Sequence, residues 1–177
     1  MALLAEEIVE EWLNRQGFFT IRGIRLGVHE IDILAVRETN GKIERRHIEV
    51  QASVRPVSYI SRVPKSVQER TGRAPTSAKT RNSEELTAGV KEWIEKKYKL
   101  QRKIDVRQEL AAGDWSFELV VHRLRHTEEL DVFKAQGIKT HLLSDVVDSL
   151  EHGEFTVSSA SGANFVDLVL MGESMPG

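Results

Sequence analysis

The dipeptide Asn40-Gly41 lies between two runs of strand-forming residues, and it restricts the fold more than any other feature of the sequence. Residues 30–36 (Glu-Ile-Asp-Ile-Leu-Ala-Val) precede it, and a second such stretch follows at about 43–54. Asn-Gly favours the two-residue turn of an antiparallel hairpin because both residues tolerate positive φ angles. A turn of that length fixes which residues of the two strands lie opposite each other.

The remaining pattern predicts helices and strands that follow one another along the chain. We expect helices at about 3–16, 84–99, 127–136 and 145–152, and strands at about 18–24, 30–36, 43–54, 115–124 and 138–143. Gly17 ends the first helix, and Asn82 and Ser144 are the expected N-caps of the second and fourth. A final hairpin is expected from Phe155–Ser158 and Phe165–Met171. The order, α-β-β-β-α-β at its start, favours an α/β fold with a mixed central sheet flanked by helices.

Length and composition predict a single domain over residues 1–177. The absence of cysteine excludes disulfide scaffolds, zinc–thiolate sites and thiol nucleophiles. No apolar run approaches the roughly 18 residues of a membrane span. The first residues turn acidic at once and lack the basic region of a signal peptide. We therefore expect a soluble, cytoplasmic protein that does not bind membranes.

The net charge of −2 conceals a strong asymmetry along the chain. Residues 55–103 carry 13 basic and 5 acidic side chains, whereas residues 104–177 carry 5 basic and 13 acidic ones. Residues 55–83 also contain three of the four prolines, and their apolar residues show no helical or strand period. We expect an irregular basic loop at about 55–83, of a length that is usually functional or mobile.

Two carboxylates lie inside apolar strands of the predicted hairpin. Asp32 is flanked by Ile31 and Ile33, and Glu49 lies on the returning strand, on the same face as Gln51. The Asn-Gly turn can bring Asp32 and Glu49 close together, where they would repel each other unless a cation lies between them. A divalent ion with oxygen ligands, Mg²⁺ above all, would resolve that conflict.

The first helix offers a third carboxylate. On a helical projection Glu6 and Glu11 lie at the two edges of the apolar arc, whereas Glu7 and Glu10 face solvent. An edge glutamate can reach over the sheet on which the helix packs. Glu6 is the first choice and Glu11 the second.

These elements together resemble the PD-(D/E)XK nuclease superfamily. The resemblance is carried by a helix with a glutamate, by Gly17-Phe18, by the strand with Asp32, and by Ile48-Glu49-Val50-Gln51. The opening is most similar to the archaeal Holliday-junction resolvases, in which the spacing from glutamate to Gly-Phe matches that from Glu6 to Gly17. The resemblance covers roughly residues 5–54 and implies a restriction-endonuclease-like core.

The resemblance also implies roles for individual residues. Asp32 and Glu49 would bind Mg²⁺, or Mn²⁺ in its place, with the main-chain carbonyl of Val50 as a further ligand and Glu6 bound directly or through water. Gln51 occupies the position that is usually the catalytic lysine. Its amide can orient a water molecule but cannot supply positive charge.

The basic loop then has an expected function as a nucleic-acid interface. The candidate residues are Arg55, Arg62, Lys65, Arg70, Arg73, Lys79 and Arg81. Because Tyr59 is the loop's single aromatic residue, base stacking there is a poor candidate, and duplex or branched DNA fits better than single strands. The sequence therefore predicts a metal-dependent nuclease that hydrolyses DNA phosphodiester bonds, with a homodimer as the expected assembly.

Other interpretations of the same residues stay open. Asp32 can be a buried structural acid paired with an arginine such as Arg22 or Arg25, and His29 and His47 can be bystanders or can support the site. A catalytically inactive nuclease-fold module that binds DNA or protein is the main alternative function. An α/β interaction domain without a nucleic-acid role is the third.

Overall fold

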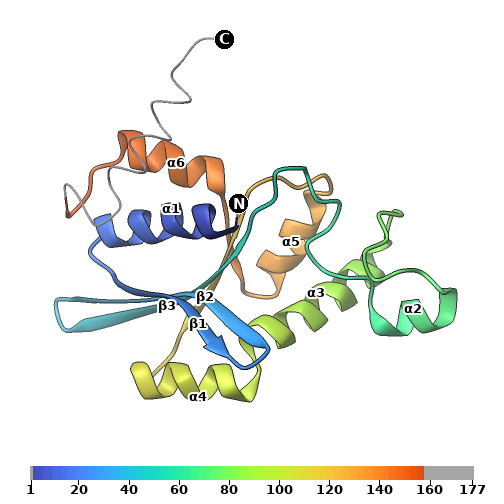
Figure 1. Cartoon of the computed structure of the whole chain (residues 1–177), viewed down its shortest axis with the longest axis horizontal. Coiled ribbons are helices and arrows are strands. Elements are labelled where there is room, and N and C mark those ends of the chain that lie inside the picture. The colour runs from blue at the N-terminus through green and yellow to red at the C-terminus, as the bar shows by residue number, and fades with distance from the viewer. Residues whose placement is uncertain (1, 158–177) are drawn as a thin grey trace, which may run out of the picture.

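The computed structural model describes residues 2–157, which form a five-stranded sheet between layers of helices (Figure 1). The strands are β1 (Phe19–Leu26), β2 (His29–Thr39), β3 (Lys42–Gln51), β4 (Ser116–Val121) and β5 (Lys139–Leu142). They lie in the sheet in chain order. The first three strands pair antiparallel, whereas β3 with β4 and β4 with β5 pair parallel. The predicted α/β class with a mixed sheet is therefore confirmed.

Helices cover both faces of this sheet. The helices are α1 (Ala2–Arg15), α2 (Lys65–Thr71), α3 (Ser83–Tyr98), α4 (Gln101–Leu110), α5 (Glu128–Ala135) and α6 (Leu143–His152). Figure 1 shows α1 and α6 on one face of the sheet and α4 on the other. Helices α3 and α5 bury apolar residues on the face opposite to α1 and α6. Within the described residues, no helix has the length and apolar character needed to cross a membrane.

Alternation along the strands divides the core between the two faces. Ile33, Ile48 and Val50 are buried with apolar residues of α1 and α6. Leu119 and Val121 of β4 are buried instead with apolar residues of α3 and α5. Because helices cover both faces, the central strands are largely buried on both sides, and a charged residue there needs a partner within the protein.

The predicted hairpin is confirmed. Thr39 pairs with Lys42 across a two-residue turn in which Asn40 and Gly41 have φ angles of 53° and 78°. Both central residues therefore adopt the left-handed conformation that Asn-Gly accommodates. The antiparallel register continues from this turn to the pair Ile33–Ile48.

The basic segment at 55–83 is more ordered than expected, because it contains α2. The helix that follows it agrees with the prediction. The Asn82 side chain accepts a hydrogen bond from the Glu85 backbone N–H at 2.8 Å and caps α3. The expected cap at Ser144 is wrong, because α6 begins two residues earlier than expected and Leu142 holds the N-cap position.

Helix α4 is absent from the prediction, and its burial explains why. Its buried residues are Lys103 and Arg107 rather than an apolar stripe, so hydrophobic periodicity does not reveal it. The expected hairpin at Phe155–Ser158 and Phe165–Met171 lies largely outside the described residues, and Phe155–Val157 form no strand.

Gly89 of α3 allows the segment before α2 to approach the helix closely. A Cβ atom at this position would lie 2.8 Å from the Arg62 carbonyl oxygen and 2.9 Å from Ser61 Oγ. Alanine normally stabilises a helix interior relative to glycine by up to about 1 kcal/mol, but such overpacking costs about 1–3 kcal/mol. We expect Gly89→Ala to lower the free energy of unfolding in urea by roughly 1–2 kcal/mol.

Lys91→Ala on the exposed side of the same helix is the matched control, and it should change that free energy by less than about 0.5 kcal/mol. A stability gain from Gly89→Ala would contradict the close packing of the two segments.

Candidate active site

The two predicted carboxylates meet where β2 and β3 separate. The last pair of the ladder is Ile33 with Ile48, so the next position in the same register places Asp32 opposite Glu49. Instead of a further backbone bond, the Val50 N–H donates to Asp32 Oδ2 at 2.8 Å. The hairpin register that the Asn-Gly turn sets therefore brings the carboxylates together as predicted.

The Glu49 carboxylate is almost completely buried and accepts bonds from three side chains. Lys103 Nζ lies 2.9 Å and His47 Nε2 3.0 Å from Oε1. Lys97 Nζ lies 2.5 Å from Oε2. The Lys103 side chain is only 2% exposed, whereas that of Lys97 is 31% exposed. Oε1 is therefore held by the buried donors Lys103 and His47, whereas the donor to Oε2, Lys97, is partly exposed to solvent.

Arg107 determines the protonation state of His47. Arg107 Nη1 lies 2.7 Å from His47 Nδ1, and a guanidinium can only donate, so Nδ1 accepts. Burial, with Arg107 and Lys103 adding to it, lowers the pKa of His47 well below its ordinary value. The ring is therefore neutral, and its one proton, on Nε2, is donated to Glu49.

The two lysines differ in their electrostatics. Burial opposes the charge of Lys97, but Glu49 and Asp32 outweigh it and raise the pKa of this amine. For Lys103 burial is the stronger influence, and it lowers the pKa despite Glu49. Lys97 is therefore the firmly charged, partly exposed ammonium of the site.

Asp32 carries the raised pKa that a pair of carboxylates predicts. Burial and then the Glu49 charge raise the pKa of Asp32 to about 6, against the lowering effect of Lys97. No arginine is ion-paired to Asp32 among residues 2–157, since Arg22 bonds Glu10 at 2.9 Å. The interpretation of Asp32 as an acid paired with an arginine such as Arg22 or Arg25 is therefore wrong.

Other buried acids in the described part of the chain occur singly. Glu11 is paired with Arg15 at 2.8 Å, Glu118 contacts His141 at 3.0 Å, and Glu129 accepts the Ile60 and Ser61 N–H groups. Both oxygens of Glu118 and of Glu129 accept hydrogen bonds, whereas Glu11 Oε2 has no partner within residues 2–157. Asp32 and Glu49 differ because two carboxylates face each other with cations around them.

Of the two helix glutamates, Glu6 is the one near the site. Burial raises its pKa, and Asp32 is the next largest cause, with Glu49 contributing less. Glu11 is 1% exposed and bonded to Arg15, so it does not serve as the third carboxylate. The first choice between Glu6 and Glu11 therefore agrees with the structure.

Gln51 is the last residue of β3, and its carbonyl accepts the His122 N–H at 3.1 Å. Alternation places its side chain on the same face as Glu49. Gln51 carries no positive charge. The positive charges beside Glu49 come instead from Lys97 of α3 and Lys103 of α4. A six-residue spacing between two lysines gives no sequence signal, because lysine in a helix is normally solvent-exposed.

The basic loop divides into exposed and internal side chains. Arg81 is buried, bonds the Ser61 carbonyl at 3.1 Å and stacks on Tyr59, and Arg73 is ion-paired with Glu85 at 3.1 Å. These two hold the segment together, which differs from the expectation of a solvent-facing set. The exposed members are Arg55, Arg62, Lys65, Arg70 and Lys79.

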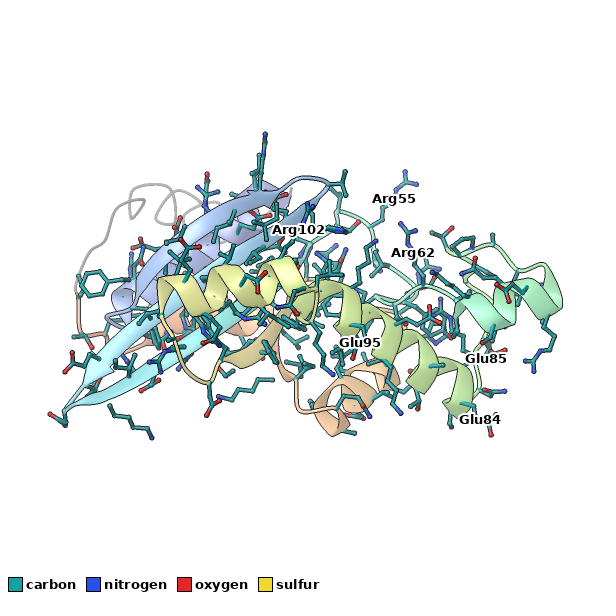
Figure 2. All side chains as sticks on the ribbon, turned by 90° about the horizontal axis from the view of Figure 1, so that it is seen from below. Arg55, Arg62, Glu84, Glu85, Glu95 and Arg102 are labelled. Atoms are coloured by element: carbon teal, nitrogen blue, oxygen red, sulfur yellow. The ribbon has the colours of Figure 1, made fainter. Side chains whose placement is uncertain are left out.

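Figure 2 shows that Arg55 and Arg62 lie on the same side of α3 as Arg102 of α4. Glu84, at the start of α3, is drawn on the opposite side. Arg102 is thus a further exposed cation on this side, although it lies outside the predicted loop.

The oxygen donors suit a hard divalent cation, although they are few. Among residues 2–157, no three histidine or acidic side chains converge as a metal-ligating group. Mg²⁺ is commonly bound through only one or two carboxylates, with water and substrate phosphate completing the shell. Asp32 and Glu49 therefore fit Mg²⁺ with substrate present.

Comparison with known proteins assigns no family or function to this chain, so the interpretation of the site depends on its geometry. No family model and no curated protein matches the sequence. A solved structure described as "Crystal Structure of Protein of Unknown Function AF1548" is 15% identical, with a TM-score of 0.47. The match covers 97% of this chain and 79% of that chain.

The raised pKa of Asp32 predicts that its charge destabilises the fold. A rise from 3.8 to about 6 means that the folded state binds the proton more tightly than the unfolded chain. Ionisation therefore costs stability, up to about 3 kcal/mol, above pH 6, and this cost disappears as the pH falls from about 6 to about 4. Asparagine keeps an acceptor for the Val50 N–H without the charge.

We expect Asp32→Asn to raise the free energy of unfolding by about 1–3 kcal/mol near pH 7.5, with the gain vanishing near pH 4. Urea unfolding at both pH values measures this. Asp105→Asn, at an exposed position of α4, is the control and should show little change at either pH. A variant Asp32→Asn that is less stable than wild type near pH 7.5 would contradict the argument.

Proposed function

We propose that this protein is a metal-dependent nuclease of the PD-(D/E)XK type that hydrolyses DNA phosphodiester bonds. One observation carries the proposal: Asp32 and Glu49 face each other on adjacent strands, and the Lys97 ammonium lies 2.5 Å from Glu49 Oε2. Carboxylates that hold a metal, next to a cation that can approach phosphate, form the minimal set for phosphodiester hydrolysis.

In this proposal Asp32 and Glu49 hold Mg²⁺ or Mn²⁺, with the Val50 carbonyl and Glu6 as further ligands. The ion would polarise the phosphate and activate a water molecule. Lys103 and His47 hold Glu49 Oε1, so that the carboxylate keeps one orientation. Arg107 supports this arrangement by holding the His47 ring in the form that donates from Nε2.

Lys97 takes the role that Gln51 cannot fill. Its pKa is raised by Glu49 and Asp32 in excess of the effect of burial, so it stays protonated and acts through charge rather than as a base. Its Nζ would stabilise the negative charge that develops on the phosphate. The Gln51 amide would orient the attacking water by hydrogen bonds.

DNA would reach the site along the exposed basic residues. Arg55 and Arg62 lie on the same side of α3 as Arg102 (Figure 2), and cations in such an arrangement contact the phosphate backbone without reading sequence. Binding through these groups should weaken steeply with added salt. A homodimer belongs to the proposal, because cutting both strands of a duplex needs two sites. A cytoplasmic location is also part of the proposal.

A catalytically inactive DNA- or protein-binding module is the second candidate, and the donors around Glu49 favour it. Three side chains already satisfy this carboxylate, which is also how a purely structural ion-pair network is built. Such a module would bind without cutting.

The carboxylates are tested by cleavage of plasmid and branched DNA with Mg²⁺ or Mn²⁺. Asp32→Asn and Glu49→Gln should each reduce the rate by at least about 100-fold, because each removes a negative ligand of the metal. Circular dichroism confirms that the variants are folded. Cleavage that persists in both variants would exclude this site, and a folded wild type that cuts neither DNA would favour the binding module.

Lys97 and Lys99 provide a matched pair of lysines on one helix end. Lys97→Ala should lower the cleavage rate about 10²–10³-fold, as expected for loss of a charged group that stabilises the transition state. Lys99, 51% exposed and paired with Glu95, lies away from Glu49, so Lys99→Ala should change the rate less than about twofold. Equal effects of the two changes would contradict the catalytic role of Lys97.

A further inference from the structure

The sheet face that carries the carboxylates continues into an apolar surface that the helices leave open. On β1, Phe19 is 84% exposed and Ile21 is 47% exposed. Together with residues of β2 and of the α4–β4 region they line a shallow hollow of about 160 Å³. The lining residues are Phe19, Thr20, Ile21, Leu34, Val36, Leu110 and Trp115. We call four of these residues, Phe19, Ile21, Leu110 and Trp115, the apolar stripe.

Sheet register ties this stripe to the candidate site. Phe19 pairs with Val36, and Ile21 pairs with Leu34. Two residues further along the same register, and on the same face, Gly23 lies opposite Asp32. Val36 and Asp32 are four residues apart on β2, which is about 13 Å along a strand. The stripe therefore begins beside the carboxylates and extends over a distance of a few nucleotides.

Gly23 keeps the passage between the stripe and Asp32 open. It has a φ angle of 69°, and the nearest atom to a Cβ built there is Glu30 Oε1 at 3.6 Å. Any larger residue would place a side chain next to Asp32 on this face. Position 23 itself therefore places no side chain between Ile21 and Asp32.

Cations lie at both ends of the stripe. Arg45 pairs with Val36, and its guanidinium packs against Gly113 and donates to the Ile43 carbonyl at 3.4 Å, with no ion pair within residues 2–157. Lys97 lies at the carboxylate end. An apolar aromatic floor between two cations is complementary to a polyanion that carries flat rings, which describes an unpaired nucleic-acid strand. A second copy of the same stripe would bring these cations against each other.

We propose that the apolar stripe binds unpaired nucleobases of the DNA strand that enters the site, with a base stacked on Phe19. This inference rests on the proposed nuclease function and specifies its substrate as DNA with an unpaired segment next to the scissile phosphate. It places base stacking on β1, outside the basic loop in which Tyr59 is the single aromatic residue. A hollow of this size holds a single base rather than a duplex.

The test is binding in EDTA, where hydrolysis does not occur. Two labelled duplexes are compared by fluorescence anisotropy: one is fully paired, and the other has the same sequence with a few unpaired nucleotides. Phe19→Ser should weaken binding to the second duplex about 5- to 100-fold, the equivalent of one lost stack, and binding to the first less than twofold. Phe19→Trp should retain binding.

Leu3→Ser is the matched control, because Leu3 is 69% exposed on α1 in the opposite layer. It should affect neither duplex. A 2-aminopurine placed in the unpaired segment should be quenched by wild type and less by Phe19→Ser.

Three results would overturn the proposal: no loss of binding to either duplex, an equal loss for both duplexes, or a change from dimer to monomer in sedimentation of Phe19→Ser. The last would assign the stripe to contact between copies. The nuclease proposal fails separately, if wild type binds the unpaired duplex through Phe19 but cuts no DNA with Mg²⁺ or Mn²⁺.

Discussion

The charge of Glu49 sets the main constraint on this structure, because it is buried on a central strand between two layers of helices. An uncompensated carboxylate there would cost several kcal/mol. Lys97 at the end of α3 and Lys103 in α4 supply the compensating charge, and His47 adds a third donor. The turn between α3 and α4 therefore has to lie over this part of the sheet.

The same arrangement accounts for the unusual composition of α4. A helix whose buried positions are Lys103 and Arg107 gains little from apolar burial. Its position depends instead on charged hydrogen bonds to Glu49 and, through His47, to the same carboxylate. Because α4 is short, it covers Glu49 but leaves Phe19 and Ile21 of β1 exposed. The open surface next to the site thus follows from how the Glu49 charge is neutralised.

The proximity of Asp32 to Glu49 lowers the stability of the folded state, and the cations that neutralise Glu49 do not remove this effect. The pKa of Asp32 remains raised although Lys97 and the Val50 N–H both act to lower it. A carboxylate held at the expense of stability is a common feature of functional sites, in contrast with Glu118, whose pKa His141 and Arg46 lower against the effect of burial. This contrast supports the interpretation of the Asp32–Glu49 pair as a site rather than as a structural contact.

The sequence by itself determined the hairpin, its register and the meeting of Asp32 with Glu49, because a two-residue Asn-Gly turn acts locally and fixes the pairing of both strands. It also determined the first helix and the capped start of α3, where Asn82 and an apolar stripe act within a few residues. Only the tertiary structure decided where the cations lie: Lys97 and Lys103 reach Glu49 from 48 and 54 residues away. No local pattern marks them, since burial of a lysine depends on a distant carboxylate. The tertiary structure likewise turned Arg73 and Arg81 inward and left Phe19 exposed, because these outcomes depend on which surfaces the helices cover.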